Sequence, residues 1–241
     1  MILRGEHVLF VIITTMKKVI LITGGNEGLG KAIAQELVSK HTVVILSYKR
    51  EDVAQAARKL KCDYEVCDVS NPVQVQIAVQ SIIHKHKRID CVVNNAGIWI
   101  KGELTENKPE EIRRVFEVNA LGPALISRAV IPYMKKQKKG LIINIVSQDG
   151  LYAKARKSAY VSSKFALTGL TKSLQLDLSP YGIKVTGVYP GRMKTNLFKN
   201  AGYKNEDLRS ALDPREVAKV VAFVIESPAT FPQIDVKHSS E

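Results

Sequence analysis

The chain has 241 residues, of which 45% are apolar, and it carries a formal net charge of +13. This length suits one domain with a full hydrophobic core, and the apolar share is ordinary for a globular protein in water. A basic balance permits nucleic-acid binding, but the lysines and arginines are spread along the chain without any nucleic-acid motif. We therefore expect no nucleic-acid partner.

The first fifteen residues contain a six-residue apolar run, Val8 to Ile13. It is short for the core of a signal peptide and far too short to span a membrane, so we expect no stable membrane insertion. Met16, followed by two lysines, looks like an alternative start. We interpret residues 1–15 as an extension outside the native domain, which then covers 16–241. A peripheral membrane contact of the extension is the interpretation that stays open beside it.

The first predicted strand, 19–23, is apolar throughout, as expected of a strand buried on both faces. It runs into a glycine-rich turn, Thr23-Gly24-Gly25-Asn26-Glu27-Gly28-Leu29-Gly30, and a helix follows over 29–40. Glycines between a strand and a helix let the backbone approach a pyrophosphate, and the helix N-terminus supplies N–H donors. The pattern predicts a dinucleotide-binding turn with contacts from Gly24, Asn26, Gly28, Leu29 and Gly30.

The remaining elements alternate along the chain. Strands are predicted at 42–47, 63–67, 90–94, 141–146, 183–189 and 234–237, and helices at 51–60, 72–87, 109–136, 158–179 and 214–227. With right-handed crossovers this order gives an α/β fold, a doubly wound parallel sheet of Rossmann type in a single domain. Ligands bind beyond the carboxyl ends of such strands. The residues at those ends are Gly24, Ser47, Asp68, Asn95, Ser147 and Pro190. Asp90 starts its strand at the other end of the sheet, so we interpret it as structural.

Tyr160 and Lys164 are four residues apart on the predicted helix 158–179, and Ser147 precedes Tyr160 by 13 residues. Residues four apart share a helix face. A neighbouring cation favours the phenolate and lowers the phenol pKa, so the pair could move a proton to or from a substrate oxygen. A tyrosine and a lysine at this spacing, without other motifs, most often lie on the surface of an amphipathic helix. The serine and the glycine turn favour the catalytic interpretation here.

Together these motifs resemble the short-chain dehydrogenase/reductase family. The matching residues are Thr23-Gly24-x-x-x-Gly28-x-Gly30, Asp68-Val69, Asn94-Asn95-Ala96-Gly97, Asn119, Ser147, Tyr160 with Lys164, and Pro190-Gly191 with Thr195. The resemblance covers residues 17 to 227. It implies hydride transfer between a nicotinamide cofactor and a small-molecule carbonyl or alcohol. The alternative on the same fold is a non-catalytic dinucleotide-binding sensor or scaffold.

The resemblance also implies four catalytic roles. Ser147 would donate a hydrogen bond to the substrate oxygen, and Tyr160 would act as the general acid or base. Lys164 would bind the ribose hydroxyls and keep Tyr160 acidic. Asn119 would support a water-linked proton path to that lysine.

Further cofactor contacts follow from the same resemblance. Asp68 and Val69 would hold the adenine, although Asp68 could instead cap the following helix. Asn95, Ala96 and Gly97 would line the adenosine, whereas Asn94 is interpreted as structural. The residues that would contact the nicotinamide end of the cofactor are Pro190, Gly191 and Thr195, together with Tyr160 and Lys164.

The tip of the second strand bears on the choice of cofactor. NAD-preferring members place an acid there for the ribose 2′-hydroxyl, whereas this chain has Ser47 and Tyr48, followed by two cations, Lys49 and Arg50. The two cations favour a 2′-phosphate, so we expect NADP over NAD. Glu27 argues the other way, because many NADP-preferring relatives carry a basic residue before the second motif glycine.

The three cysteines lie in or beside predicted strands, without metal-binding spacing. Reduced thiols, a cytoplasmic protein and no metal site are therefore expected. The C-terminus lacks the Val-Asp-Gly-Gly segment that packs between subunits in many relatives, so we expect a homodimer, with a tetramer as the alternative that stays open. The substrate pocket is expected from Ile98, Trp99, Lys101, Leu151, Tyr152, Lys154, Arg156, Arg192 and 197–203, which do not identify the substrate.

Overall fold

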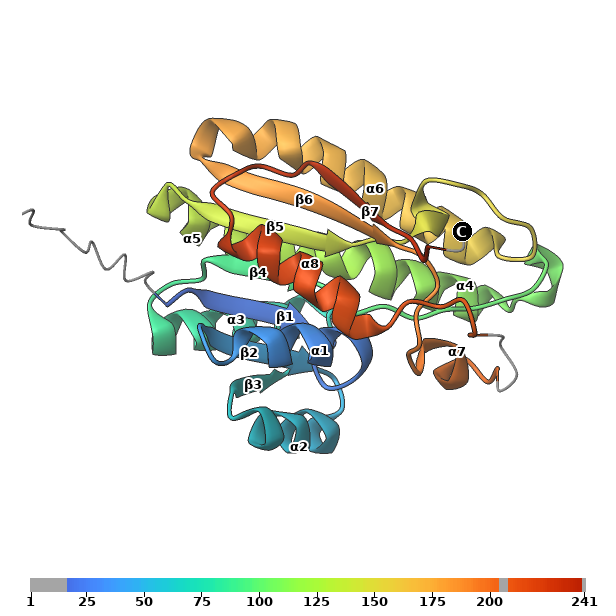
Figure 1. Cartoon of the computed structure of the whole chain (residues 1–241), viewed down its shortest axis with the longest axis horizontal. Helices are drawn as coiled ribbons and strands as arrows, with labels where there is room; N and C mark the ends of the chain where they lie inside the picture. The colour runs from blue at the N-terminus through green and yellow to red at the C-terminus, as the bar shows by residue number, and fades with distance from the viewer. Residues whose placement is uncertain (1–16, 204–207, 240–241) are drawn as a thin grey trace, which may run out of the picture.

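The computed structural model describes residues 17–203 and 208–239. Seven strands form one parallel sheet in the order β3-β2-β1-β4-β5-β6-β7 (Figure 1). The strands are β1 (Val19–Thr23), β2 (Thr42–Ser47), β3 (Asp63–Val66), β4 (Cys91–Asn94), β5 (Gly140–Ile145), β6 (Ile183–Pro190) and β7 (Gln233–Val236). The order reverses direction at β1, so the predicted doubly wound Rossmann sheet is confirmed.

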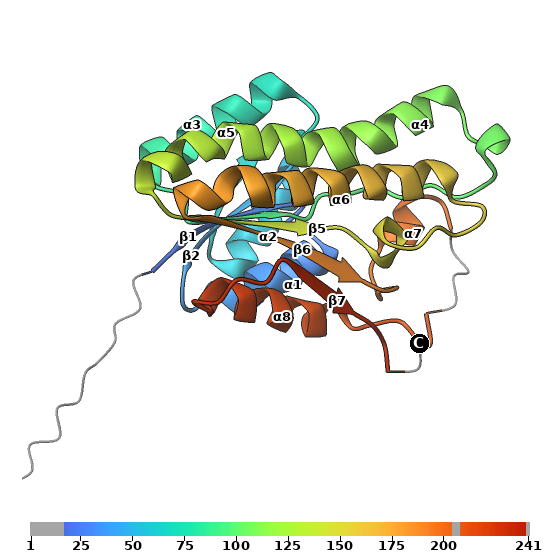
Figure 2. The same ribbon diagram turned by 90° about the horizontal axis from the view of Figure 1, so that it is seen from above.

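Two layers of helices cover the sheet (Figure 2). One face carries α1 (Gly28–Leu37), α2 (Arg50–Leu60) and α8 (Pro214–Glu226). The other carries α3 (Pro72–His86), α5 (Gly122–Gln137) and α6 (Ser158–Leu178). The central strands are apolar on both sides because each side packs against a helical layer. Among the described residues, no helix is both long and apolar enough to cross a bilayer.

The helix expected over 109–136 is interrupted, and this prediction is corrected. α4 (Pro109–Phe116) passes into a π-helical turn, Glu117–Leu121, before α5 begins. Pro123 has no N–H to donate to the carbonyl four residues earlier, so the regular helical ladder fails there. The π turn contains Asn119.

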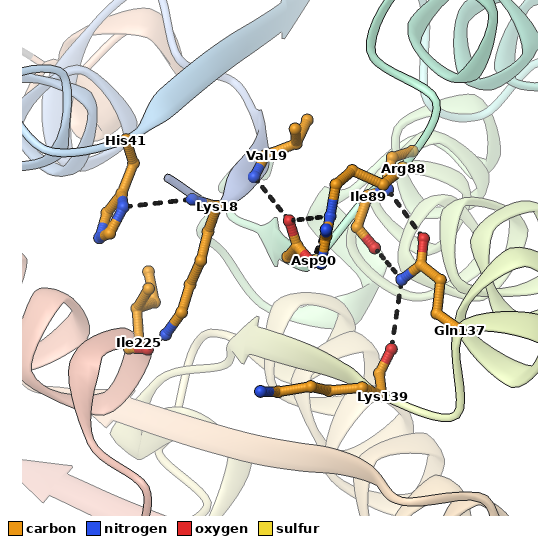
Figure 3. Close-up of polar contacts among 9 residues, drawn as sticks. All are labelled: Lys18, Val19, His41, Arg88, Ile89, Asp90, Gln137, Lys139 and Ile225. Atoms are coloured by element: carbon orange, nitrogen blue, oxygen red, sulfur yellow. Dashed lines mark hydrogen bonds and ion pairs between the residues drawn. The ribbon is translucent and has the colours of Figure 1, made fainter. Parts of the chain in front are cut away.

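Polar contacts join the loops at the amino ends of the strands (Figure 3). The backbone N–H of Val19 donates to the Asp90 carboxylate at 2.8 Å, and Arg88 donates to the same carboxylate. The Gln137 side chain bonds both backbone groups of Ile89. Asp90 therefore fixes the start of β1 at the edge opposite the strands' carboxyl ends, as predicted.

Other boundaries differ by a few residues. The first helix ends at Leu37 rather than at 40, and a short helix, α7 (Leu197–Asn200), was not predicted. The predicted extension, 1–15, lies outside the described residues. The three cysteines are free thiols, and burial raises the pKa of each of them.

Candidate active site

A cavity of about 1190 Å³ opens at the carboxyl ends of the strands and gathers most of the predicted site residues. Those that line it are Gly24, Asn26, Gly28, Leu29, Ser47, Tyr48, Lys49, Asp68, Val69, Asn95, Ala96, Gly97, Ser147, Tyr160, Lys164, Pro190, Gly191 and Thr195. Gly30 and Asn119 do not line it. One cleft therefore brings together residues more than 160 positions apart in the sequence, from Gly24 to Thr195.

The glycine turn is built for close approach of a ligand. Gly24 and Gly28 have φ of 64° and 54°, in the left-handed region that favours glycine. A Cβ on Gly30 would lie 2.3 Å from the Gly24 carbonyl oxygen, so only glycine lets α1 pack on the turn. The Asn95 amide donates to the carbonyls of Thr23 and Gly24 and fixes the loop. The backbone and the α1 N-terminus thus fit a dinucleotide pyrophosphate.

Asp68 does not cap the helix that follows it. Asn71 does so, its side chain accepting from the N–H groups of Val73 and Gln74. The Asp68 carboxylate instead accepts from Ser70 and from the Arg114 guanidinium, at 2.8 Å. Partial burial would raise the pKa of Asp68, but hydrogen bonds from Ser70 and Arg114 lower it overall. An ionised carboxylate therefore lies at this end of the cleft, with Arg114 as a neighbour that the sequence analysis did not identify.

At the tip of β2, Ser47 is buried whereas Tyr48 and Lys49 are exposed. The Ser47 hydroxyl accepts from the Lys49 N–H at 3.4 Å, which folds the turn toward the cavity. The Lys49 ammonium lies 3.9 Å from the Asp52 carboxylate. An exposed ion pair of this length is weak, so the cation could be redirected to an anion.

Ser147, Tyr160 and Lys164 meet at the other end of the cleft. Ser147 lies two residues beyond the end of β5, and the first two turns of α6 carry Tyr160 and Lys164. Both α6 side chains are buried. The Lys164 ammonium donates to the Ile145 carbonyl at 3.2 Å and lies 5.8 Å from the centre of the Tyr160 ring.

The expected lowering of the phenol pKa is not what this arrangement produces. Burial, followed by the charge of Asp149, raises the pKa of Tyr160, and a hydrogen bond with Ser147 offsets only part of the rise. Burial also lowers the pKa of Lys164 to about 8. Removal from water disfavours the phenolate and the ammonium alike. At Tyr160 the charge of Asp149 adds to the effect of burial on the pKa, and at Lys164 burial outweighs that charge. Tyr160 therefore keeps its proton at neutral pH, which suits a general acid.

Asp149 is a buried carboxylate in the same cavity, and the sequence analysis did not identify it. Its oxygens lie 3.2 Å from the Lys157 ammonium and 3.5 Å from that of Lys154. Its charge raises the pKa of both Tyr160 and Lys164. Its position, two residues after Ser147 at a strand end, is the signal that could have revealed it.

Asn119 is fully buried beneath the cleft and holds one of its walls. Its side chain accepts from the Ile98 N–H at 2.8 Å and donates to the Ile98 carbonyl at 2.9 Å. It also donates to the Ser163 hydroxyl at 3.1 Å. A Cβ on Gly97 would lie 3.3 Å from the Asn119 oxygen and 3.7 Å from the Lys164 nitrogen. Asn119 and Lys164 thus both lie beside Gly97, and Asn119 does not line the cavity.

The short helix α7 forms part of the wall of the cleft. The Trp99 ring packs edge-on against Phe198 and Tyr203, with centroid distances of 4.8 and 5.0 Å. Asn196 and Asn200 donate to the two oxygens of Glu27, at 3.1 and 2.9 Å. Glu27 therefore joins the glycine turn to α7, a role that the sequence analysis missed because the partners are 169 and 173 residues away.

Two buried donors in the cavity wall have no protein partner among the described residues. They are the indole nitrogen of Trp99 and the amide nitrogen of Gln148. Of the predicted pocket residues, Ile98, Trp99, Lys101, Lys154, Arg192, Leu197, Phe198, Asn200, Ala201 and Tyr203 line the cavity. Leu151, Tyr152, Arg156, Lys199 and Gly202 do not.

Comparison with known proteins gives one consistent result. Residues 18–227 match the family model for short chain dehydrogenases. The chain is 33% identical over 229 residues to a cyclopentanol dehydrogenase of Comamonas testosteroni, covering 89% of this chain and 92% of that one. It is 32% identical over 225 residues to a 3-alpha-(or 20-beta)-hydroxysteroid dehydrogenase of Mycobacterium bovis, with coverages of 89% and 84%. A 3-ketoacyl-(acyl-carrier-protein) reductase of Brucella melitensis, solved with NADH, superposes with a TM-score of 0.86 at 27% identity, covering 92% and 97%.

Proposed function

We propose, from the premise that this chain belongs to the short-chain dehydrogenase family, that it reduces a small-molecule carbonyl to an alcohol with NADPH. Membership of the family makes it an NAD(P)-dependent oxidoreductase. The observation that carries the proposal is the shared cavity, in which the glycine turn lies at one end and Ser147, Tyr160 and Lys164 at the other. A non-catalytic sensor would need only the first of these.

The bound nicotinamide would supply the hydride, while the protein manages orientation and the proton. Tyr160, protonated because it is buried, donates its proton to the substrate oxygen as negative charge develops there. Ser147 donates a hydrogen bond to the same oxygen and stabilises that charge. Lys164 holds the ribose side of the cleft, and its lowered pKa allows it to pass a proton onward.

The preference for NADPH rests on the tip of β2. The tip of β2 presents Lys49 and the Ser47 hydroxyl, which already accepts one weak hydrogen bond. The residues of this tip that line the cavity include no carboxylate that could bind a ribose hydroxyl. Glu27, the residue that argued for NAD, is engaged by two asparagines of the α7 segment. Its carboxylate is therefore held toward α7.

The substrate end favours a compound with oxygen acceptors beyond the reacting carbonyl. The unpartnered nitrogens of Trp99 and Gln148 are donors whose burial without a partner is costly. Lys154 and Lys157 add positive charge beside Asp149. We also propose a cytoplasmic homodimer, without metal or nucleic acid in its reaction.

The test is the Tyr160→Phe variant assayed with both cofactors against a panel of ketones, ketoacids and acyl thioesters. General acid catalysis contributes about 10²–10⁴-fold, so turnover should fall by that factor while NADPH binding, followed by its fluorescence, is retained. Near-normal turnover in the variant contradicts the assigned role. A wild-type chain that binds NADPH but turns over nothing in the panel favours the sensor or scaffold instead.

A further inference from the structure

The positive charge of this chain is gathered on one edge of the molecule. We define the basic face as the segments that precede the strands, 17–18, 38–41, 58–62, 85–90, 135–139 and 179–184. They hold fourteen lysines and arginines and one carboxylate, Asp90. The rest of the sequence has twenty-two basic and twenty-two acidic residues, so the whole net charge of +13 belongs to this face.

The topology brings these segments together. In a parallel sheet every strand starts at the same edge, so the loops before β1 to β6 lie side by side, at the left in Figures 1 and 2. Basic residues that are dispersed in sequence thus become neighbours in space. Contacts among Val19, Arg88, Asp90, Ile89 and Gln137 tie the loops to one another (Figure 3). These hydrogen bonds hold the loops of the basic face in place, at the edge of the sheet opposite the cleft.

Three lysines occupy positions where lysine is an unfavourable choice. Lys61, Lys87 and Lys138 end α2, α3 and α5 with φ of 56°, 64° and 53°. Glycine is the usual residue at a left-handed helix end, because a side chain makes this conformation costly. A cation near a helix C-terminus is favourable, but a lysine one turn earlier would provide that without strain. The placement indicates that charge at these loop tips has a use.

These charges are also available to a partner. Among the described residues, the side chains of Lys61, Lys87 and Lys138 have no hydrogen bond or ion pair, and all three are exposed. Two carboxylates that border the face are already engaged, Asp63 by Lys85 and Glu226 by Lys40. In Figure 3 the dashed contact of Lys139 runs to its backbone carbonyl, not to its ammonium.

We propose that the basic face docks the protein on an anionic lipid bilayer. Only two of its fourteen cations are arginines, the residue that recognises nucleic-acid phosphates in bidentate fashion. Tyr181 is the aromatic residue that this face exposes. The Lys135 ammonium lies 3.6 Å from the centre of its ring, so little of the ring surface is left for stacking with a base. Leu176, 79% exposed, is an apolar group at this edge. In the sequence, the apolar run Val8–Ile13 precedes Lys17, which belongs to this face. A basic surface together with an apolar segment is what an anionic bilayer attracts, so lipid is the occupant that fits.

Docking in this way leaves the cleft facing water. The cavity lies at the carboxyl ends of the strands, and the basic face lies at their amino ends. Cytoplasmic leaflets carry anionic lipids, and each lysine near such a surface strengthens binding roughly fivefold. The enzyme would then work at a membrane surface while taking its substrate from solution.

The test uses the full chain and vesicles of phosphatidylcholine, with and without phosphatidylglycerol. The wild type should sediment with the anionic vesicles only, and salt should release it. The variant Lys61→Gly/Lys87→Gly/Lys138→Gly should bind on the order of a hundredfold more weakly. Glycine suits all three backbone positions, so its melting temperature should hold or rise and its turnover should not change.

The control variant, Lys108→Gln/Arg113→Gln/Lys219→Gln, removes the same charge away from the face and should bind like the wild type. Equal losses in the two triple variants would reduce the effect to net charge and overturn the proposal. Wild-type binding retained by the glycine variant would assign it to residues 1–16 instead. Retention on a DNA duplex without binding to vesicles would replace lipid by nucleic acid and likewise overturn it.

Discussion

Asp149 is the carboxylate whose charge reaches both groups that we propose to handle the proton, Tyr160 and Lys164. It raises the pKa of Tyr160 and opposes the lowering of the Lys164 pKa. Lys154 and Lys157 hold it in place from the loop before α6. The pH range in which Tyr160 keeps its proton therefore depends on a residue that need not touch the substrate.

Replacing this carboxylate should shift the pH profile in a defined direction. In Asp149→Asn the pKa of Tyr160 and that of Lys164 both fall, because the charge that raises them is gone. The alkaline limb of kcat/KM for reduction should then move to lower pH, since the acid form is lost earlier. Asp177→Asn, an exposed carboxylate on α6, is the control and should leave the limb in place. A limb that stays or moves upward contradicts the assignment.

Ser47 tests the choice between the two cofactors. In Ser47→Asp a carboxylate stands where we expect the 2′-phosphate, and one charge-assisted contact contributes roughly 1.5–3 kcal/mol. NADPH should bind about tenfold more weakly or worse, while NADH affinity holds or improves. Fluorescence titration with both cofactors measures the difference. An equal response would place the 2′ position elsewhere.

At the scale of elements, we expect the contact between α7 and the glycine turn to limit access to the cleft. Asn196→Ala/Asn200→Ala removes both hydrogen bonds to Glu27 without changing the charge near the pyrophosphate. Two hydrogen bonds at about 0.5–1.5 kcal/mol each correspond to roughly tenfold faster opening. Amide hydrogen exchange across 197–203 should speed up by that factor, and the KM for the cofactor should rise. Lys199→Ala on the same helix is the control. Equal rates of amide exchange in both variants would contradict the role that we give to the hydrogen bonds of Glu27.

The sequence was sufficient for elements whose causes are local. Apolar runs and turns placed all seven strands and the main helices, because strand burial and helix amphipathicity leave periodic patterns. The π turn at 117–121 was missed because it depends on one absent N–H at Pro123 within an otherwise helical pattern. The α7 segment was missed because four residues carry no periodicity, and its position depends on Trp99 and Glu27, far away in the chain.

The candidate site divides in the same way. The glycine turn, Ser147 and the Tyr160–Lys164 spacing are visible in sequence because each motif is continuous. Arg114 beside Asp68 and the lysines around Asp149 are not, since those contacts require the finished fold. The lowered phenol pKa was wrong for a related reason, because burial is a property of the assembled cleft.

At the scale of the whole molecule, among the described residues the buried members of both large apolar clusters lie between Val19 and Ile225. We expect a chain that starts at Met16 to keep its melting temperature within a few degrees and its full activity. Six apolar side chains at roughly 1.5–3 kcal/mol each would be a large loss if the fold buried Val8–Ile13. A clear drop in melting temperature on deletion would show that the segment is structural.

The basic face lies at one edge of the sheet and the proposed active-site cleft at the other, so the molecule should adsorb to a negatively charged surface in one orientation. On a sulfonated bead, a mica sheet or a carboxylated electrode, the protein should adsorb through the basic face, with its cleft turned to the liquid. An adsorbed monolayer would then keep its turnover per molecule, where random attachment would block many openings. No tag or coupling chemistry would be needed, and a pulse of salt would strip the layer for reuse.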